Sequence, residues 1–91
     1  MRSRATARFW WLYDALPDAV RRKARQTYRL WLSNPDHPSL QFKRLHRVDG
    51  AVWSIRIGLS WRALATLEGD TVLWFWIGSH ADYDRQIGGD D

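Results

Sequence analysis

The sequence has no cysteine, so disulfide bonds and thiolate metal sites are excluded. Its longest uninterrupted apolar run covers residues 72–77, far short of the roughly 20 residues that a membrane-spanning helix needs. The histidines His37, His46 and His80 lack the close spacing of metal ligands, and neither a glycine-rich phosphate loop nor a Ser-His-Asp pattern occurs. We therefore expect a domain without a metal or cofactor, stabilised by packing alone.

Acidic residues are scarce in the first two thirds of the chain. Residues 1–62 contain 13 Lys and Arg against 4 Asp and Glu, whereas residues 63–91 contain 1 against 6. A basic surface attracts polyanions, because their binding releases counterions. This balance favours nucleic acid or the ribosome as a partner, although a solvated helix face with ordinary surface arginines has the same composition. The basic residues 1–4 lead into no signal-peptide apolar segment, and a cytoplasmic protein is expected.

Large apolar side chains are abundant. Hydrophobic residues make up 45% of the chain, with seven Trp and three Phe among them. A chain of 91 residues has room for one core. The composition predicts a single domain over residues 1–91, with its core at about 5–87 and a flexible tail at 88–91.

Helical spacing dominates the first third of the chain. One apolar stripe predicts a first helix over residues 6–15. Pro17 and Asp18 suit the first turn of a second helix, which Pro35 ends. The stripe of the first helix consists of Phe9, Leu12, Tyr13 and Leu16.

Alternating and fully apolar segments follow. A first strand is expected to start at Leu40 and to end near His46, and three more at 53–57, 61–67 and 71–77. No strand is expected in residues 1–5, which show no apolar alternation. The pattern predicts an α+β fold: two N-terminal helices packed on one face of a four-stranded, mostly antiparallel sheet, with a short C-terminal helix or tail.

Arg56 and Arg62 lie on neighbouring strands around a short turn, opposite the apolar faces of those strands. Such a pair can converge on one phosphate, which arginine binds in a bidentate manner. In the alternative, each pairs with a carboxylate or faces water. Since four acids precede Arg62, partners within the chain are few, and an anion site is favoured.

His80 and Tyr83 directly follow the apolar strand. Histidine changes its charge near neutral pH and serves as acid or base, but a lone histidine here could also cap a helical turn. Tyr83 could stack on a nucleobase or donate a proton, or it could pack on the sheet edge. Both alternatives stay open at this point.

A basic cluster precedes the expected hairpin turn at Asp49-Gly50. Its position at a strand end suits contact with RNA phosphates, and it equally suits a charged edge that discourages aggregation. The cluster consists of Lys43, Arg44, His46 and Arg47.

Taken in order, six segments resemble the RelE/ParE superfamily of bacterial toxins from type II toxin–antitoxin modules, and the likeness covers about residues 5–87. None of the segments is diagnostic by itself; the ordered set is specific. The segments are Leu16-Pro17, residues 31–40, 42–45, 53–57, 61–64 and 76–84.

The resemblance to RelE-like members implies a metal-independent endoribonuclease that cuts mRNA in the ribosomal A site. Attack by a 2′-hydroxyl gives a cyclic phosphate, and a cognate antitoxin protein neutralises the toxin. The free toxin is expected to be a monomer and to form a hetero-oligomer with the antitoxin. By position, Arg62 resembles the family's phosphate-stabilising arginine, supported by Arg56, while Tyr83 resembles the C-terminal tyrosine and His80 a catalytic histidine or arginine.

Two departures bear on this resemblance. Several RelE-like enzymes carry an arginine just after the glycine that ends the last strand, where this chain has Ser79-His80. ParE-like members share the fold but inhibit DNA gyrase and cut no RNA. A non-enzymatic gyrase inhibitor is therefore the alternative function.

Overall fold

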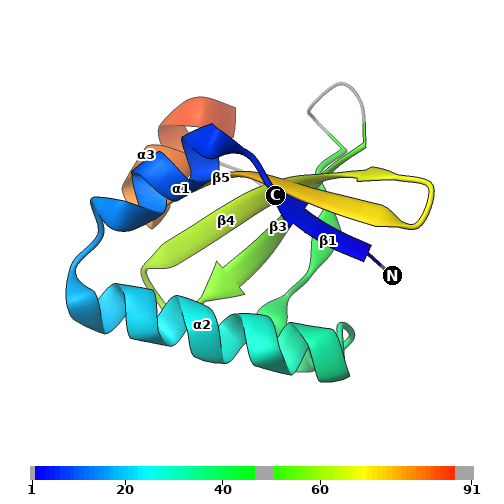
Figure 1. Cartoon of the computed structure of the whole chain (residues 1–91), viewed down its shortest axis with the longest axis horizontal. Coiled ribbons are helices and arrows are strands. Elements are labelled where there is room, and N and C mark those ends of the chain that lie inside the picture. The colour runs from blue at the N-terminus through cyan, green and yellow to red at the C-terminus, as the bar shows by residue number, and fades with distance from the viewer. Residues whose placement is uncertain (1, 47–50, 88–91) are drawn as a thin grey trace.

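The computed structural model describes residues 2–46 and 51–87, and Figure 1 shows their arrangement. The strands are β1 (Arg2–Ala5), β2 (Lys43–Arg44), β3 (Val52–Ile57), β4 (Trp61–Glu68) and β5 (Thr71–Ser79). The helices are α1 (Ala7–Asp14), α2 (Asp18–Ser33), a 3₁₀ turn η1 (Pro38–Leu40) and α3 (His80–Ile87). The predicted α+β class is confirmed. The expected turn at Asp49-Gly50 and the expected tail at 88–91 lie outside the described residues.

Within the described residues, the sheet has five strands in the order β1-β5-β4-β3-β2, one more than predicted. The additional strand, β1, pairs in parallel with β5 at the sheet edge, and the other pairs are antiparallel. Its side chains alternate between exposed and half-buried, so no apolar pattern marks it in the sequence. Backbone hydrogen bonds from Arg2 N to Asp70 O (2.7 Å) and from Thr6 N to Trp74 O (2.9 Å) hold its two ends.

The main core lies between the sheet and the first two helices, which is the predicted layer arrangement. Thr6 caps α1 by accepting a hydrogen bond from Phe9 N at 3.1 Å, and Pro17 precedes α2. In Figure 1, α2 runs beside the sheet, and α1 lies over β5. The buried residues of this core include Ala24, Trp31, Ile55, Ile57, Ala63, Ala65, Val72, Trp74 and Ile77.

A second, smaller core lies on the opposite face of the sheet. This core includes Trp76 because β5 has a bulge. Leu64 of β4 pairs with Trp76 and Ala65 pairs with Trp74, so Phe75 is an extra, unpaired residue in β5. The bulge shifts the alternation, so the Trp76 side chain points away from the α1–α2 side. Helix α3 covers this core with Tyr83, which is 4% exposed.

The strand expected from Leu40 to near His46 is much shorter than predicted. Pro38–Leu40 forms the 3₁₀ turn instead, and Gln41 ends it in the left-handed conformation with φ 43°. Lys43 and Arg44 form the strand and pair with Ser54 and Trp53 of β3, and the Leu45 N–H donates to the Val52 carbonyl at 2.8 Å. The turn buries Leu40 (2% exposed) in the main core, which the alternating pattern does not reveal.

None of the helices within the described residues is both long and apolar enough to cross a bilayer.

Candidate anion-binding site

A small pocket lies on the sheet face opposite α1 and α2, with a volume of about 140 Å³. Alternation along β3 and β4 turns Ser54, Arg56 and Arg62 toward this pocket, while Ile55, Ile57 and Ala63 face the main core. Helix α3 closes one side of it. The pocket is lined by Gln41, Lys43, Ser54, Arg56, Arg62, His80, Tyr83 and Asp84.

The two arginines of the pocket lie directly opposite each other in the β3–β4 register. Arg56 donates from Nε to the Gly58 carbonyl at 3.1 Å, and Arg62 donates from Nη1 to the Trp61 carbonyl at 2.8 Å. Both bonds are partly buried, so the guanidinium groups are held near the strand ends. Like charges directly across a strand pair repel each other, and a bound anion offsets this repulsion.

Tyr83 joins the pocket to the second core. Its ring packs in the cluster with Leu64 and Trp76, and the Arg62 Cζ lies 5.9 Å from the ring centroid, within the range of a cation–π contact. Because the residue is 4% exposed, its ring has little free surface on which a nucleobase could stack. Of the alternatives for Tyr83, packing against the sheet is therefore what the structure shows.

His80 opens α3, and its side chain lies at the pocket mouth. The backbone N–H of His80 donates to the Ser60 carbonyl at 2.7 Å, which ties the helix start to the β3–β4 turn. The His80 Nε2 lies 3.2 Å from the Asp84 Oδ2, one helical turn further on. His80 thus contacts a carboxylate through its ring, and its side chain is 46% exposed.

Ser79 and Gly78 have structural reasons for their positions before His80. The Ser79 Oγ accepts a hydrogen bond from Asp82 N at 3.1 Å and caps α3. At Gly78, a Cβ atom would lie 2.6 Å from Cζ2 of the buried Trp76 ring. Glycine therefore leaves room for the Trp76 ring at this position, and Ser79 provides the cap of the helix that follows.

The structure divides the predicted basic cluster. Lys43 faces the pocket, because it pairs with Ser54, while Arg44 pairs with Trp53 and lies on the other side of β2. His46 is exposed and outside the pocket lining. Arg47 lies outside the described residues. Their RNA-binding role stays a prediction, and of the three that the structure describes, Lys43 alone lines the pocket with Arg56 and Arg62.

Three pocket residues received no role from the sequence. Ser54 shares its strand face with Arg56, and Asp84 lies four residues after His80 on a helix, so both positions follow from simple periodicity. Gln41 could not be placed, because its position depends on the left-handed end of the 3₁₀ turn. Across residues 2–46 and 51–87, no three His, Asp or Glu side chains gather as metal ligands would.

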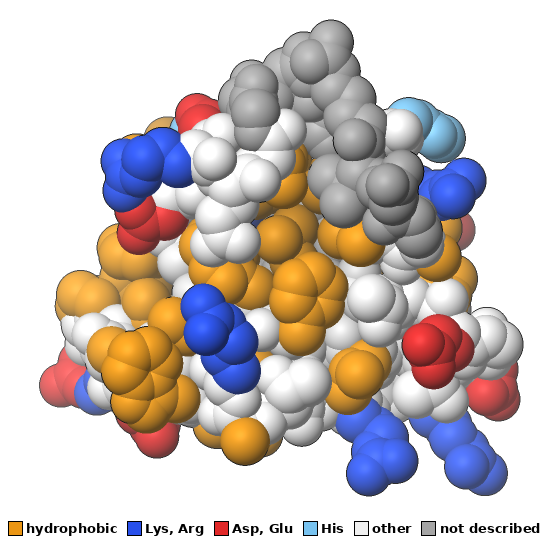
Figure 2. All heavy atoms as spheres, turned by 90° about the horizontal axis from the view of Figure 1, so that it is seen from above, with side chains coloured by type: hydrophobic (Ala, Val, Ile, Leu, Met, Phe, Trp, Pro, Cys, Tyr) orange, Lys and Arg blue, Asp and Glu red, His pale blue; other side chains and the backbone are white. Residues whose placement is uncertain are grey.

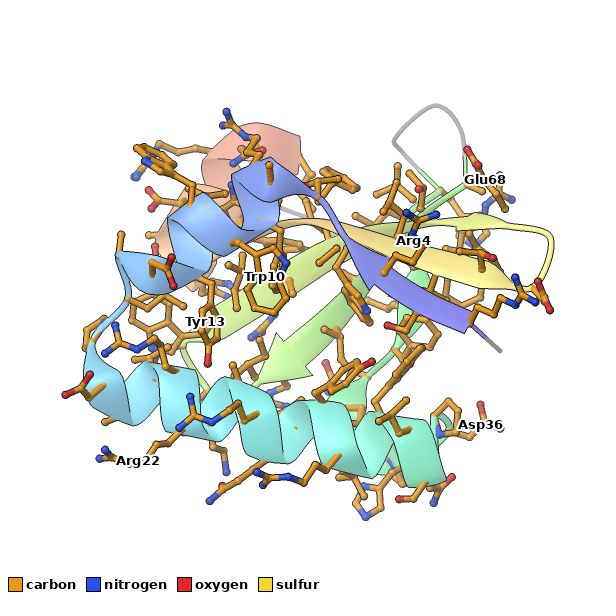
Figure 3. All side chains as sticks on the ribbon, viewed as in Figure 1. Arg4, Trp10, Tyr13, Arg22, Asp36 and Glu68 are labelled. Atoms are coloured by element: carbon orange, nitrogen blue, oxygen red, sulfur yellow. The ribbon has the colours of Figure 1, made fainter. Side chains whose placement is uncertain are left out.

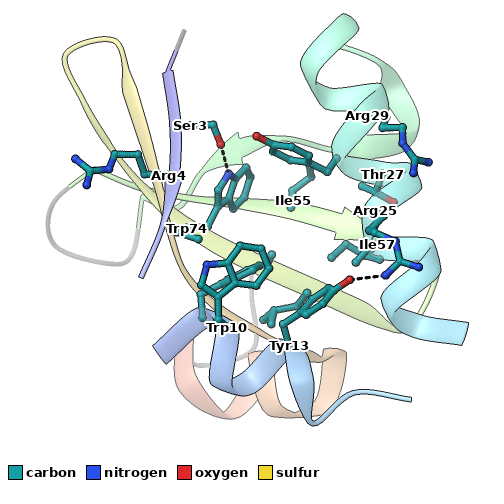
Figure 4. A pocket seen from close by; sticks show the side chains of 16 residues that line it. Ser3, Arg4, Trp10, Tyr13, Arg25, Thr27, Arg29, Ile55, Ile57 and Trp74 are labelled. Carbon is teal, nitrogen blue, oxygen red and sulfur yellow. Dashed lines mark hydrogen bonds between the residues drawn. The ribbon is translucent and has the colours of Figure 1, made fainter. Parts of the chain in front are cut away.

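A larger cavity of about 390 Å³ opens on the other side of the sheet, among β1, α1 and α2 (Figure 4). We call it the helix-side groove. Its floor is apolar, formed by residues such as Ile55, Ile57 and Trp74, and the Trp74 Nε1 donates to Ser3 Oγ at 3.1 Å. At one end, Arg25 donates to the Tyr13 hydroxyl at 2.7 Å. Figure 4 shows Arg4 and Arg29 at its periphery.

On the face shown in Figure 2, the positive charge is not concentrated in one patch. On the face shown in Figure 2, hydrophobic side chains gather in the middle, and Lys and Arg lie singly or in small groups around them. The densest described combination of cations with a histidine and a tyrosine is the 140 Å³ pocket.

The fold is similar to that of several small α+β toxins of known structure. YafQ from E. coli strain BL21(DE3) aligns with a TM-score of 0.72 at 13% identity, covering 91% of this chain and 98% of YafQ. The YoeB/ParE toxin from Agrobacterium tumefaciens gives 0.68 at 22% identity, covering 88% and 99%. The archaeal RelE–RelB complex from Pyrococcus horikoshii OT3 gives 0.67 at 12% identity, covering 86% and 92%.

The family follows from the sequence model of the ParE-like toxin domain, which matches residues 18–85. The chain belongs to this family and is a toxin of the RelE/ParE superfamily, as predicted. Among curated protein sequences, none matches the chain significantly.

Proposed function

We propose that this toxin represses translation by cutting ribosome-bound mRNA in the 140 Å³ pocket. The observation that carries the proposal is the convergence of Lys43, Arg56 and Arg62 with His80 and Tyr83 in one small pocket. Three cations suit the charge of a phosphodiester, the histidine is a group that exchanges protons, and the tyrosine ring positions Arg62. The pocket residues fit a reaction that uses side chains alone.

In the proposed reaction, the 2′-oxygen loses its proton to His80 and attacks the adjacent phosphorus. A new P–O2′ bond forms and the P–O5′ bond breaks, giving a cyclic phosphate on one fragment. The 5′-oxygen of the other fragment takes a proton from a solvent water molecule and leaves as a hydroxyl. Arg62 and Arg56 stabilise the extra negative charge of the five-coordinate phosphorus, with Lys43 beside them.

Tyr83 has a supporting place in this scheme. Its buried ring fixes α3 against the sheet and lies beside the Arg62 guanidinium, so it orients that cation toward the phosphate. His80 is held at the start of the same helix, 5.9 Å from the Tyr83 ring between centroids. The reacting groups from the sheet and from α3 therefore keep one geometry.

The alternative function is inhibition of DNA gyrase without RNA cleavage. The observation that favours it is the family match itself, which is to the ParE-like toxin domain. Such an inhibitor needs no acid–base pair and would act through its surface. Two assays distinguish the two functions: mapping of mRNA 5′ ends in cells after brief induction, and DNA supercoiling by gyrase with the purified toxin added. New 5′ ends within coding sequences support the nuclease. Intact mRNA together with inhibited gyrase supports the inhibitor.

The cognate antitoxin is the second partner of the proposal. Solved relatives include RelE–RelB complexes from Pyrococcus horikoshii, Methanococcus jannaschii and E. coli. We assign the antitoxin of this toxin to the helix-side groove, whose apolar floor and arginine periphery suit a segment with large apolar and acidic side chains. Trp10 and Tyr28 line the groove and are 51% and 39% exposed, so a bound segment would remove apolar surface from water.

Reversing the charge of Arg29 is expected to weaken antitoxin binding by at least ~10-fold, because an acidic side chain then faces an acidic segment. Arg22→Glu is the matched control: it makes the same charge change on α2, where Figure 3 shows Arg22 pointing away from the sheet. Titration calorimetry with the co-expressed antitoxin measures both. Equal losses in the two variants would contradict the groove as the docking site.

The groove and the pocket lie on opposite faces of the sheet. The free toxin is proposed to be a monomer in the cytoplasm, where mRNA and ribosomes are present, and the bound form a hetero-oligomer. A segment in the groove leaves the pocket itself uncovered, so neutralisation would need a second antitoxin segment at the pocket or steric exclusion from the ribosome.

A further inference from the structure

Asp84 lies in the pocket although its charge opposes the binding of an anion. It is the one carboxylate among the described residues that line the pocket, beside Lys43, Arg56 and Arg62. An acid at this position lowers the positive potential that attracts a phosphate. Anion binding therefore does not explain it, and its contact with His80 has to be considered.

His80 and Asp84 are the first and fifth residues of α3, so they lie one above the other on the same helix face. The Nε2–Oδ2 distance of 3.2 Å is that of a hydrogen bond or ion pair. The other acid near the helix start, Asp82, pairs with Arg85 instead and is absent from the pocket lining. Within one short helix, one acid therefore faces the pocket histidine and the other does not.

We infer that Asp84 is a positioning residue that fixes the tautomer of His80. When Nε2–H donates to the Asp84 carboxylate, the neutral imidazole carries its lone pair on Nδ1. Nδ1 is then the nitrogen that takes a proton, and the imidazolium formed is stabilised by the carboxylate across the ring. The charged and titratable groups that line the same pocket are Lys43, Arg56, Arg62, Tyr83 and Asp84.

This inference rests on the proposed function where it assigns the reacting nitrogen, and on geometry alone where it assigns the tautomer. Without Asp84, no carboxylate in the pocket accepts the Nε2 proton, and both neutral tautomers become populated. The fraction of toxin with a correctly oriented base falls. Loss of Asp84 should therefore lower the rate of cleavage and leave substrate binding unimpaired.

The test uses ¹⁵N-histidine NMR on the full chain, at a pH where His80 is neutral. In the parent, we expect the chemical shifts of an Nε2-protonated ring at His80. Asp84→Ala should shift them toward a mixture of tautomers, while Asp82→Ala, the matched control on the same helix, should leave them unchanged. His37 and His46 provide internal references in each spectrum, because both lie outside the pocket lining.

The same variants are assayed for cleavage of ribosome-bound mRNA across pH. Asp84→Ala should lose about 10- to 100-fold in kcat with KM little changed, as when the partner that orients a functional histidine is removed. Asp84→Asn, which keeps an acceptor without the charge, should restore the tautomer and part of the rate. Unchanged His80 shifts in Asp84→Ala would overturn the inference. If Asp84→Ala changes the His80 chemical shifts but the parent protein cleaves no mRNA, the proposed function is overturned and the tautomer assignment stands.

Discussion

Replacing Arg62 by alanine is expected to reduce mRNA cleavage by about 10²–10³-fold and to abolish toxicity on induction. Arg62 lines the pocket from β4, opposite Arg56, and its guanidinium is held by the Trp61 carbonyl at 2.8 Å. Because the Arg62 guanidinium is already in place, it can stabilise the negative charge that develops on the phosphate without first moving. Its loss should therefore lower mainly kcat. Growth after tightly controlled induction and single-turnover cleavage measure the effect.

Two controls separate this role from charge and from folding. Arg22→Ala removes one positive charge on the outer side of α2 and should leave both toxicity and cleavage unchanged. Arg62→Lys keeps the charge but loses the bidentate fork, and an intermediate rate is expected. If Arg62→Ala remained as toxic as the parent while His80→Ala did too, the proposed nuclease mechanism would be wrong.

Replacing Trp31 by alanine is expected to cost about 3–5 kcal/mol of unfolding free energy, because a large buried ring leaves a cavity behind. Trp31 is 2% exposed at the centre of the main core. Its ring lies edge-on to Trp74 at 5.3 Å and to Phe42 at 5.7 Å, and it stacks on Tyr28 at 5.9 Å between centroids. It thereby joins α2 to β5 and to the segment before β2.

Chemical denaturation followed by circular dichroism measures this loss. Trp11→Ala is the matched control, because Trp11 is 71% exposed and its loss should change stability by less than ~0.5 kcal/mol. Trp31→Phe should cost less than Trp31→Ala, because phenylalanine keeps an aromatic ring in the core. Its lack of an N–H group loses no hydrogen bond, since the Trp31 Nε1 has no acceptor among the described residues. A Trp31→Ala protein within 1 kcal/mol of the parent would contradict the proposed core.

The parts of the fold that were predicted are those with a strong apolar period. Phe9, Leu12 and Tyr13 mark α1, and the alternation at Ile55 and Ile57 marks β3, because burial of one face dictates their spacing. β1 was missed, since its edge pairing depends on backbone hydrogen bonds such as Arg2 N to Asp70 O. The strand at Leu40 was predicted to be too long, because the left-handed conformation of Gln41 interrupts it and leaves no mark in the apolar pattern.

For the candidate site, the sequence indicated the positively charged residues. Arg56 and Arg62 follow from strand alternation and a short turn, and Lys43 joins them through its pairing with Ser54. Asp84 received no role, although four residues separate it from His80, because the helix that aligns them was expected only as a helix or tail. Once residues 80–87 are known to be a helix, its periodicity places Asp84 beside His80.

The most direct test of the central claim is the chemistry of the RNA ends. Purified toxin is added to ribosomes paused on a defined mRNA, and the products are analysed by mass spectrometry. We predict cleavage within the A-site codon, a cyclic phosphate on the upstream fragment and a 5′-hydroxyl on the downstream one. Intact mRNA at full occupancy of the toxin, together with inhibition of gyrase supercoiling in parallel, would contradict the account.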